Sequence, residues 1–167
     1  MNRKTLFMLS VATVIAAAVF VAFRSPAERE GGSAASIPAL SETYANPDYG
    51  FSFKYPAGSI VYAMPYGDGI AITVNDKNAG KGFQITIQPF DEPMDALTAE
   101  RVRKDLSDLP INNPEETTVG GEGKGISFNN DSSKHIWFIA RGNLYQATSP
   151  LDSQRLLLAV MHTVSFE

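Results

Sequence analysis

The sequence predicts an α+β protein in which helices pack on a central antiparallel sheet, preceded by one transmembrane helix. Three observations support this fold class. Residues 5–23 form an uncharged apolar run, several later segments alternate apolar and polar residues as half-buried strands do, and two segments have helical spacing. Short turns separate these segments, which favours one antiparallel sheet covered by helices.

Residues 1–24 are predicted to be a signal anchor, that is, an uncleaved transmembrane helix. A helix over residues 5–23 is about 28 Å long at 1.5 Å per residue, close to the thickness of a bilayer's hydrocarbon core. Arg3 and Lys4 precede it and Arg24 alone follows. The positive-inside rule then leaves the N-terminus in the cytoplasm and places the domain on the periplasmic or extracellular side. A cleaved signal peptide is the alternative, because residues 25–27 resemble a small-residue cleavage site.

The rest of the chain divides into a linker and one domain. Residues 25–41 are rich in Ser, Pro, Ala and Gly and are predicted to be a flexible spacer. Residues 42–167 suffice for one domain with a single core. Apart from Arg3, Lys4 and Arg24, the chain has 11 of its 14 basic residues and all 18 acidic ones, a net charge of −7. Such a surface repels phosphate backbones, so no nucleic-acid partner is expected.

Strand patterns recur along the domain. Residues 50–56 place three aromatic side chains on one face and polar ones on the other, and a proline ends the run. Residues 136–139 are apolar on both faces, which predicts a central strand, and Gly142 and Asn143 predict the two-residue turn after it. The predicted strands are residues 50–56, 59–64, 70–74, 83–88, 117–119, 125–129, 135–141 and 144–149.

Two segments have helical spacing instead. Between residues 95 and 109 the apolar side chains fall on one stripe, with Asp95 or Thr98 as the N-cap and Pro110 after the end. Asp152 is predicted to cap a second helix that runs to about residue 162.

Three segments resemble the PsbP-like superfamily. They are Tyr49-Gly50-Phe51-Ser52-Phe53-Lys54-Tyr55-Pro56, Val119-Gly120-Gly121 and Val164-Ser165-Phe166. The resemblance covers residues 42–167 and implies an α/β/α sandwich around an antiparallel sheet. This superfamily includes the extrinsic PsbP subunit of photosystem II, a Ran-binding nuclear import factor and many exported bacterial proteins. Because these roles are unrelated, the fold does not give the function, and no functional residue of PsbP is carried over.

The sequence indicates no cofactor, no metal site and no catalytic residue. It has no cysteine, and the spacing of His135 and His162 fits no compact metal motif. Both histidines are interpreted as structural. Residues 120–125 are glycine-rich, but Gly125 follows Lys124 where a phosphate loop needs Ser or Thr. No G-x-S-x-G elbow marks a nucleophile.

Two sets of side chains are candidates for a binding surface. Gln84, Thr86 and Gln88 share the polar face of the strand predicted at residues 83–88, where they either line a cleft or face solvent; solvent is favoured. Four tyrosines could form an aromatic surface, although ordinary positions on a half-buried sheet explain them better. These are Tyr44, Tyr49, Tyr62 and Tyr66.

The sequence therefore favours a non-enzymatic binding or assembly module, anchored in the cytoplasmic membrane with its domain outside the cytoplasm. Its expected partners are the membrane, through the N-terminal helix, and another exported or membrane protein. Two alternatives remain open: a hydrolase with an unrecognised site, and a photosystem-associated subunit, which the family resemblance alone suggests.

Overall fold

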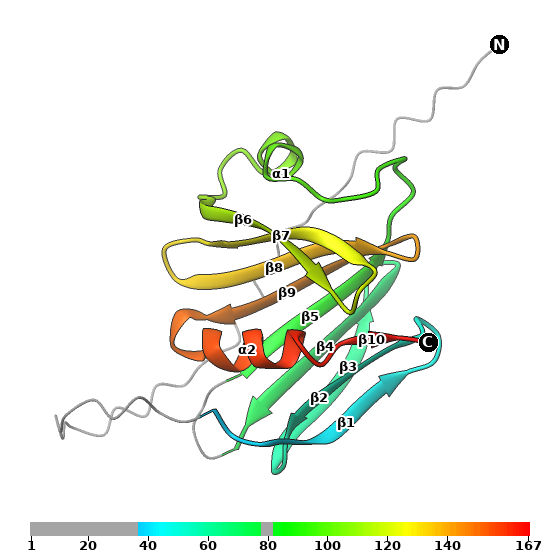
Figure 1. The fold of residues 1–167 in the computed structure, drawn as a ribbon, viewed down its shortest axis with the longest axis vertical. Coiled ribbons are helices and arrows are strands. Elements are labelled where there is room, and N and C mark those ends of the chain that lie inside the picture. Colours follow the sequence, from blue (N-terminus) through cyan, green and yellow to red (C-terminus); the bar gives the residue numbers. More distant parts are fainter. Residues whose placement is uncertain (1–36, 78–81) are drawn as a thin grey trace, which may run out of the picture. The chain divides into compact units, whose positions relative to one another are not determined.

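The computed structural model describes residues 37–77 and 82–167. In this part of the chain most residues lie in strands, and the helices are short (Figure 1). The elements are β1 (Leu40–Asn46), β2 (Phe51–Pro56), β3 (Ser59–Tyr66), β4 (Gly69–Asp76), β5 (Gly82–Pro89), α1 (Ala99–Asp105), β6 (Asn112–Val119), β7 (Gly123–Asn129), β8 (Ser133–Ala140), β9 (Asn143–Pro150), the 3₁₀ turn η1 (Leu151–Ser153), α2 (Gln154–Met161) and β10 (Ser165–Phe166).

The strands form two antiparallel sheets. The larger sheet has seven strands in the order β3-β4-β5-β9-β8-β7-β6, and the smaller has three in the order β1-β2-β10. β8 lies inside the larger sheet, between β9 and β7, which confirms the central position predicted from its two apolar faces. The turn before β9 is made by Arg141 and Gly142, both with positive φ, so the predicted pair Gly142 and Asn143 is one residue late.

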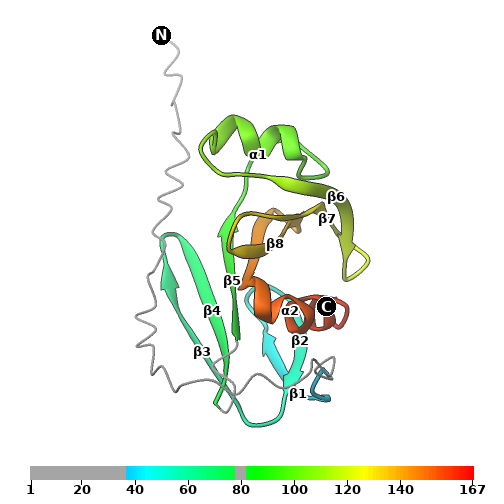
Figure 2. The ribbon, with the colours of Figure 1, turned by 90° about the vertical axis from the view of Figure 1, so that its left-hand side faces the viewer.

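One face of the larger sheet carries the main core. The smaller sheet and α2 pack on this face, and Figure 2 shows α2, β1 and β2 together on one side of β5. The alternation of β2 is the cause: Phe51 and Phe53 are 2% and 1% exposed, while Ser52 and Lys54 point away. The main core comprises Phe51, Phe53, Ile72, Val74, Phe83, Ile85, Ile87, Val119, Ile136, Phe138, Ala140, Tyr145, Ala147, Leu156, Leu157, Val160, Met161 and Val164.

A second core lies on the opposite face, over β7, β8 and β9 only. α1 and the segments around it cover this part of the sheet, so that β7 and β8 lie between α1 and α2 (Figures 1 and 2). We call this the α1 core, and it comprises Phe90, Leu97, Val102, Ile126, Phe128, Trp137, Ile139 and Leu144.

The predicted fold class, an α/β/α sandwich with one central antiparallel sheet, is wrong. The domain is mostly β, with two sheets, and α1 and α2 have only seven and eight residues. Helices this short cannot cover a seven-stranded sheet. The smaller sheet therefore replaces a helical layer over part of one face, and α1 covers only part of the other.

The transmembrane helix predicted at residues 5–23, with the anchor assigned to residues 1–24, lies outside the described residues. Within residues 37–77 and 82–167, no helix has the length and apolar character needed to span a bilayer. The predicted linker also lies largely outside, and β1 begins at Leu40.

Candidate functional site

The candidate site is the part of the larger sheet that α1 leaves uncovered, on the face opposite the main core. We call it the open face. It consists of side chains from β3, β4, β5 and β9: Ile60, Tyr62, Met64, Thr73, Gln84, Thr86, Gln88 and Gln146.

The open face follows directly from strand alternation. Ile85 and Ile87 are fully buried in the main core, so Gln84, Thr86 and Gln88 point to the other side, where each is half-buried. The structure thus brings the three predicted site residues together on one face, as the alternation predicts. Their neighbours on both sides complete the surface.

Cross-strand hydrogen bonds organise the polar part of the open face. Gln84 lies opposite Thr73 on β4, and its Nε2 donates to Thr73 Oγ1 at 3.3 Å. Thr86 lies opposite Gln146 on β9, and its hydroxyl donates to Gln146 Oε1 at 3.2 Å. These bonds orient the Gln84, Thr86 and Gln146 side chains along the sheet.

The apolar part of the open face lies on β3. Ile60, Tyr62 and Met64 are 47%, 43% and 49% exposed. In the strand register Tyr62 is opposite Thr73 and Met64 is opposite Ala71, so the apolar row lies directly beside the polar rows of β4 and β5. Alternate side chains of a strand point to one face, so three large apolar groups lie together in solvent.

Sequence reasoning did not single out Ile60 and Met64. Because β3 is apolar at nearly every position, its pattern gives no indication of which face is exposed. Pro65 was the available signal, because proline in a strand indicates the edge of a sheet.

The four tyrosines do not form one surface. Tyr44 stacks on Phe53 at 5.2 Å between ring centroids, and Tyr49 packs against the main core. Only Tyr62 and Tyr66 lie on β3, and of these Tyr62 is the exposed one.

Gln84 lies opposite Thr148 on β9, and Thr148 lies opposite His135 on β8. This row of opposite residues therefore leads from the open face to His135, beneath the α1 core. His135 is 6% exposed, stacks on Phe128 at 4.7 Å, and its Nδ1 is hydrogen-bonded to Thr148 Oγ1 at 3.1 Å. Burial, and secondarily the charge of Lys134, lowers the pKa of His135 to about 4. The imidazole is therefore neutral at neutral pH, in an environment of aromatic rings and a threonine.

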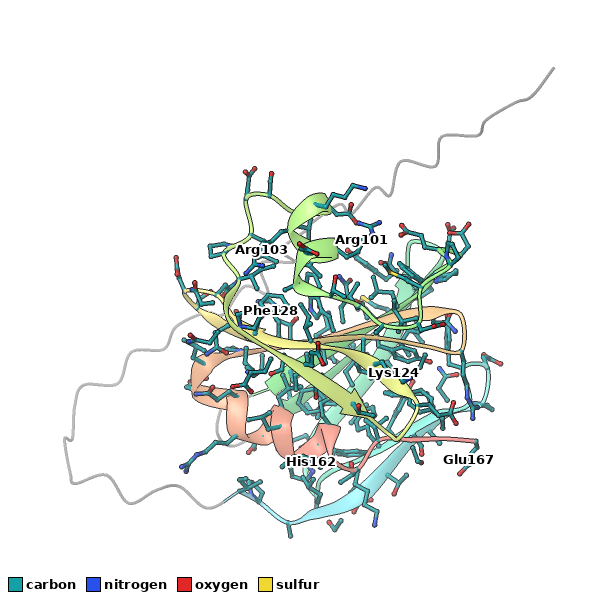
Figure 3. The ribbon with its side chains drawn as sticks, turned by 45° about the horizontal axis from the view of Figure 1, so that its top comes forward. Arg101, Arg103, Lys124, Phe128, His162 and Glu167 are labelled. Carbon is teal, nitrogen blue, oxygen red and sulfur yellow. The ribbon has the colours of Figure 1, made fainter. Side chains whose placement is uncertain are left out.

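The two histidines lie apart in the fold. His162 is exposed at the end of α2, whereas Phe128, on which His135 stacks, lies under α1 with Arg101 and Arg103 on that helix (Figure 3). Neither histidine has a carboxylate among the contacts described. Within residues 37–77 and 82–167 no three His, Asp or Glu side chains are placed to hold a metal ion.

A shallow cavity of about 460 Å³ lies between the start of α1 and the strands β6 and β7. It is lined by Leu97, Thr98, Glu115, Glu116, Lys124 and Ile126, among others. Its lining contains carboxylates and an ammonium group but no histidine.

Comparisons with known proteins found no matching family model and no matching curated protein. Among solved structures, the chain is similar to cyanobacterial PsbP (CyanoP) from Synechocystis sp. PCC 6803, at a TM-score of 0.49 and 16% sequence identity. The likeness covers 81% of this chain and 98% of that one. It concerns the course of the backbone only, and the functional argument below is built on the residues of the open face.

Proposed function

We propose that this chain is a non-enzymatic binding module whose open face docks another protein. The observation that carries the proposal is the exposure of Ile60, Tyr62 and Met64 in one row beside Gln84, Thr86 and Gln88. Contiguous apolar side chains on a soluble surface mark interaction sites, and adjacent polar groups supply the rim that orients a partner.

Rigidity supports the same proposal. The hydrogen bonds from Gln84 to Thr73 and from Thr86 to Gln146 hold the polar side chains before any partner arrives. A partner therefore meets a surface whose side chains are already ordered, which reduces the entropy that binding costs. The partner that fits has an apolar contact surface with polar groups around it.

The hydrolase alternative receives no support from the geometry. His135 is buried among rings and His162 is at the far end of α2, so they do not form one constellation. The photosystem-associated role stays a prediction from the family resemblance. The location of the domain outside the cytoplasm also stays a prediction, and protease added outside the cytoplasmic membrane tests it.

The test of the proposed function is site-specific crosslinking of the full-length chain in its own cells. A photoreactive side chain at Gln88, inside the open face, should give an adduct with a second, different protein, identified by mass spectrometry. The Thr86→Arg substitution places a charge on the face and should reduce that adduct at least about tenfold, the loss expected for a misplaced charge in an interface.

Two controls make the test specific. The same photoreactive group at Thr43, exposed on the smaller sheet, should not give the Gln88 adduct. Thr118→Arg, an exposed threonine on β6, should leave the Gln88 adduct unchanged. An adduct that persists in Thr86→Arg, or that forms equally from Thr43, would show that the open face is not the docking surface.

A further inference from the structure

We propose that the full chain is a homodimer in which the β3 strands of two copies pair antiparallel, centred on Tyr62, and join two open faces into one. The inference rests on the proposed function, because it states how the docking surface is assembled. It starts from the difference between the two edges of the larger sheet.

The β6 edge is protected against pairing with another strand. It carries Pro114, Glu115 and Glu116, all exposed, and its register is irregular between Asn112 and Glu115. Charge, proline and irregular register are the devices that keep sheet edges from joining.

The β3 edge has no charged residue that would keep another strand from pairing with it. Its eight residues, Ser59 to Tyr66, include no charged side chain, and its register with β4 is regular throughout. Among the described residues no strand pairs with its outer side. A long, regular, uncharged edge is a template for a further strand.

The one proline of β3 indicates which backbone groups face outward. A proline lacks an N–H, so it is tolerated where that N–H would face away from the neighbouring strand. Pro65 pairs with Ile70 on β4, so residues in step with Pro65 direct their N–H and C=O outward. These are Ser59, Val61 and Ala63, and Pro65 contributes its C=O.

This alternation selects a symmetric register. Pairing centred on Tyr62 places Val61 opposite Ala63 of the other copy, so both exchange hydrogen bonds, and places Ser59 opposite Pro65, whose C=O can accept. On the open face it places Tyr62 opposite Tyr62 and Ile60 opposite Met64, so that the three exposed apolar side chains contact their counterparts side by side and keep their outer surface in solvent.

The self-complementary register of the uncharged β3 favours a second copy as the occupant. The chain is acidic overall, so two copies repel each other along most of their surface. β3 is an uncharged stretch where that repulsion is smallest, and the strand it best accepts is another uncharged strand of the same length. A twofold axis perpendicular to the sheet supplies this strand and keeps both open faces on the same side.

The dimer enlarges the docking surface. The six apolar side chains from the two copies form one central stripe, and the Gln84, Thr86 and Gln88 row of each copy lies on either side of it. A partner that docks on this composite face contacts both copies.

A single cysteine tests the register directly, because the natural chain has none. Opposite residues of a non-hydrogen-bonded antiparallel pair lie about 4.5 Å apart between Cα atoms, within the range of a disulfide. Full-length chain carrying Tyr62→Cys should therefore oxidise to a covalent dimer at least about tenfold faster than the matched neighbour Ala63→Cys, whose cysteine does not meet its own counterpart.

Two further variants complete the experiment. Ile60→Cys alone should not form the fast dimer, whereas Ile60→Cys combined with Met64→Cys should. Adding Ala63→Pro to Tyr62→Cys removes an outward N–H and should abolish fast oxidation, with circular dichroism verifying the fold.

Equal oxidation rates for Tyr62→Cys and Ala63→Cys would overturn the homodimer. That outcome is distinct from failure of the proposed function, because the Gln88 adduct with a different protein reports the open face whether or not two copies pair. Loss of the Gln88 adduct with retained Tyr62→Cys dimerisation would instead overturn the proposed function and leave the dimer standing.

Discussion

His135 shows how the chemistry of a single side chain depends on its place in the sheet. The histidine is the third residue of β8, where its ring is buried between Phe128 and Trp137, with centroid distances of 4.7 and 5.5 Å. A charged imidazolium there would lose its hydration without gaining a carboxylate, so the folded protein favours the neutral form. The neutral ring contributes to stability through its aromatic neighbours and its hydrogen bond to Thr148.

The low pKa of His135 predicts a loss of stability in mild acid. An unfolded histidine titrates near 6.5, and the folded one at about 4, so the unfolded chain binds the proton first as the pH falls. The contribution is fully present above pH 6.5 and is lost toward pH 4. Between pH 7 and 5 the free energy of unfolding should fall by about 2 kcal/mol through this group, measured by urea unfolding followed by circular dichroism.

Matched variants isolate that contribution. His135→Gln removes the titrating group and should flatten the decrease between pH 7 and 5, although its stability at pH 7 is lower. His162→Gln, at the exposed end of α2, should leave the pH dependence of the natural chain in place. If the two variants responded alike, the assigned pKa of His135 would be wrong.

At the scale of elements, α1 depends on its first residue. Thr98 is the N-cap, and its hydroxyl accepts a hydrogen bond from the Arg101 backbone N–H at 3.1 Å. The helix has only seven residues, and the cap satisfies one of the N–H groups at its start that have no acceptor within the helix. The same short helix places Val102 in the α1 core.

Thr98→Ala should therefore lower the free energy of unfolding by about 1 kcal/mol, the usual cost of losing such a cap. Thr98→Ser keeps the hydroxyl and should retain most of that stability. Urea midpoints of the three proteins measure the difference. Equal losses in Ala and Ser would indicate that the threonine methyl group, and not the cap, is what stabilises α1.

The sequence predicted the strands more accurately than the helices, for a physical reason. In β5 and β8 the alternation or the continuous apolar run directly reflects burial on one or both faces. The helix predicted over residues 95–109 is shorter in the structure, where α1 covers only Ala99–Asp105. Leu97, Leu106 and Leu109 lie outside the helix and still pack in or against the α1 core. The apolar spacing correctly indicated which side chains are buried. A long helix was only one of the structures that can bury them.

β1 was not predicted as a strand at all. Its sequence, LSETYAN, is mostly polar, and only Leu40 and Tyr44 pack against the main core. The strand forms because β2 supplies the pairing partner along its whole length. Pairing of this kind depends on tertiary structure, which a single strand's sequence does not contain.

At the scale of the whole molecule, the open face was predictable only in part. Alternation alone placed Gln84, Thr86 and Gln88 on one side of their strand. The exposure of Ile60 and Met64 depends on β3 being the terminal strand and on α1 covering the other half of the sheet. Strand order and the placement of a covering helix are properties of the assembled fold.

The assembled fold has two cores, yet residues 37–167 should unfold as one cooperative unit. β8 joins the cores, since Ile136 and Phe138 point into the main core while Trp137 and Ile139 point into the α1 core. β9 does the same through Tyr145 and Leu144. Losing either core therefore removes the packing on one face of these central strands, and two-state unfolding is expected.

The single tryptophan makes this measurable, because Trp137 fluorescence reports the α1 core while circular dichroism reports both sheets. In urea the two signals should change at the same concentration for residues 37–167, which contain the residues named above for both cores. Val102→Ala, which removes apolar volume from the α1 core alone, should shift both transitions together to lower urea. A fluorescence transition that precedes the loss of circular dichroism would mean that α1 and its core separate from the sheet first. The half of the sheet that α1 covers would then also become exposed. The extent of the open face would in that case depend on the free energy with which α1 packs on the sheet.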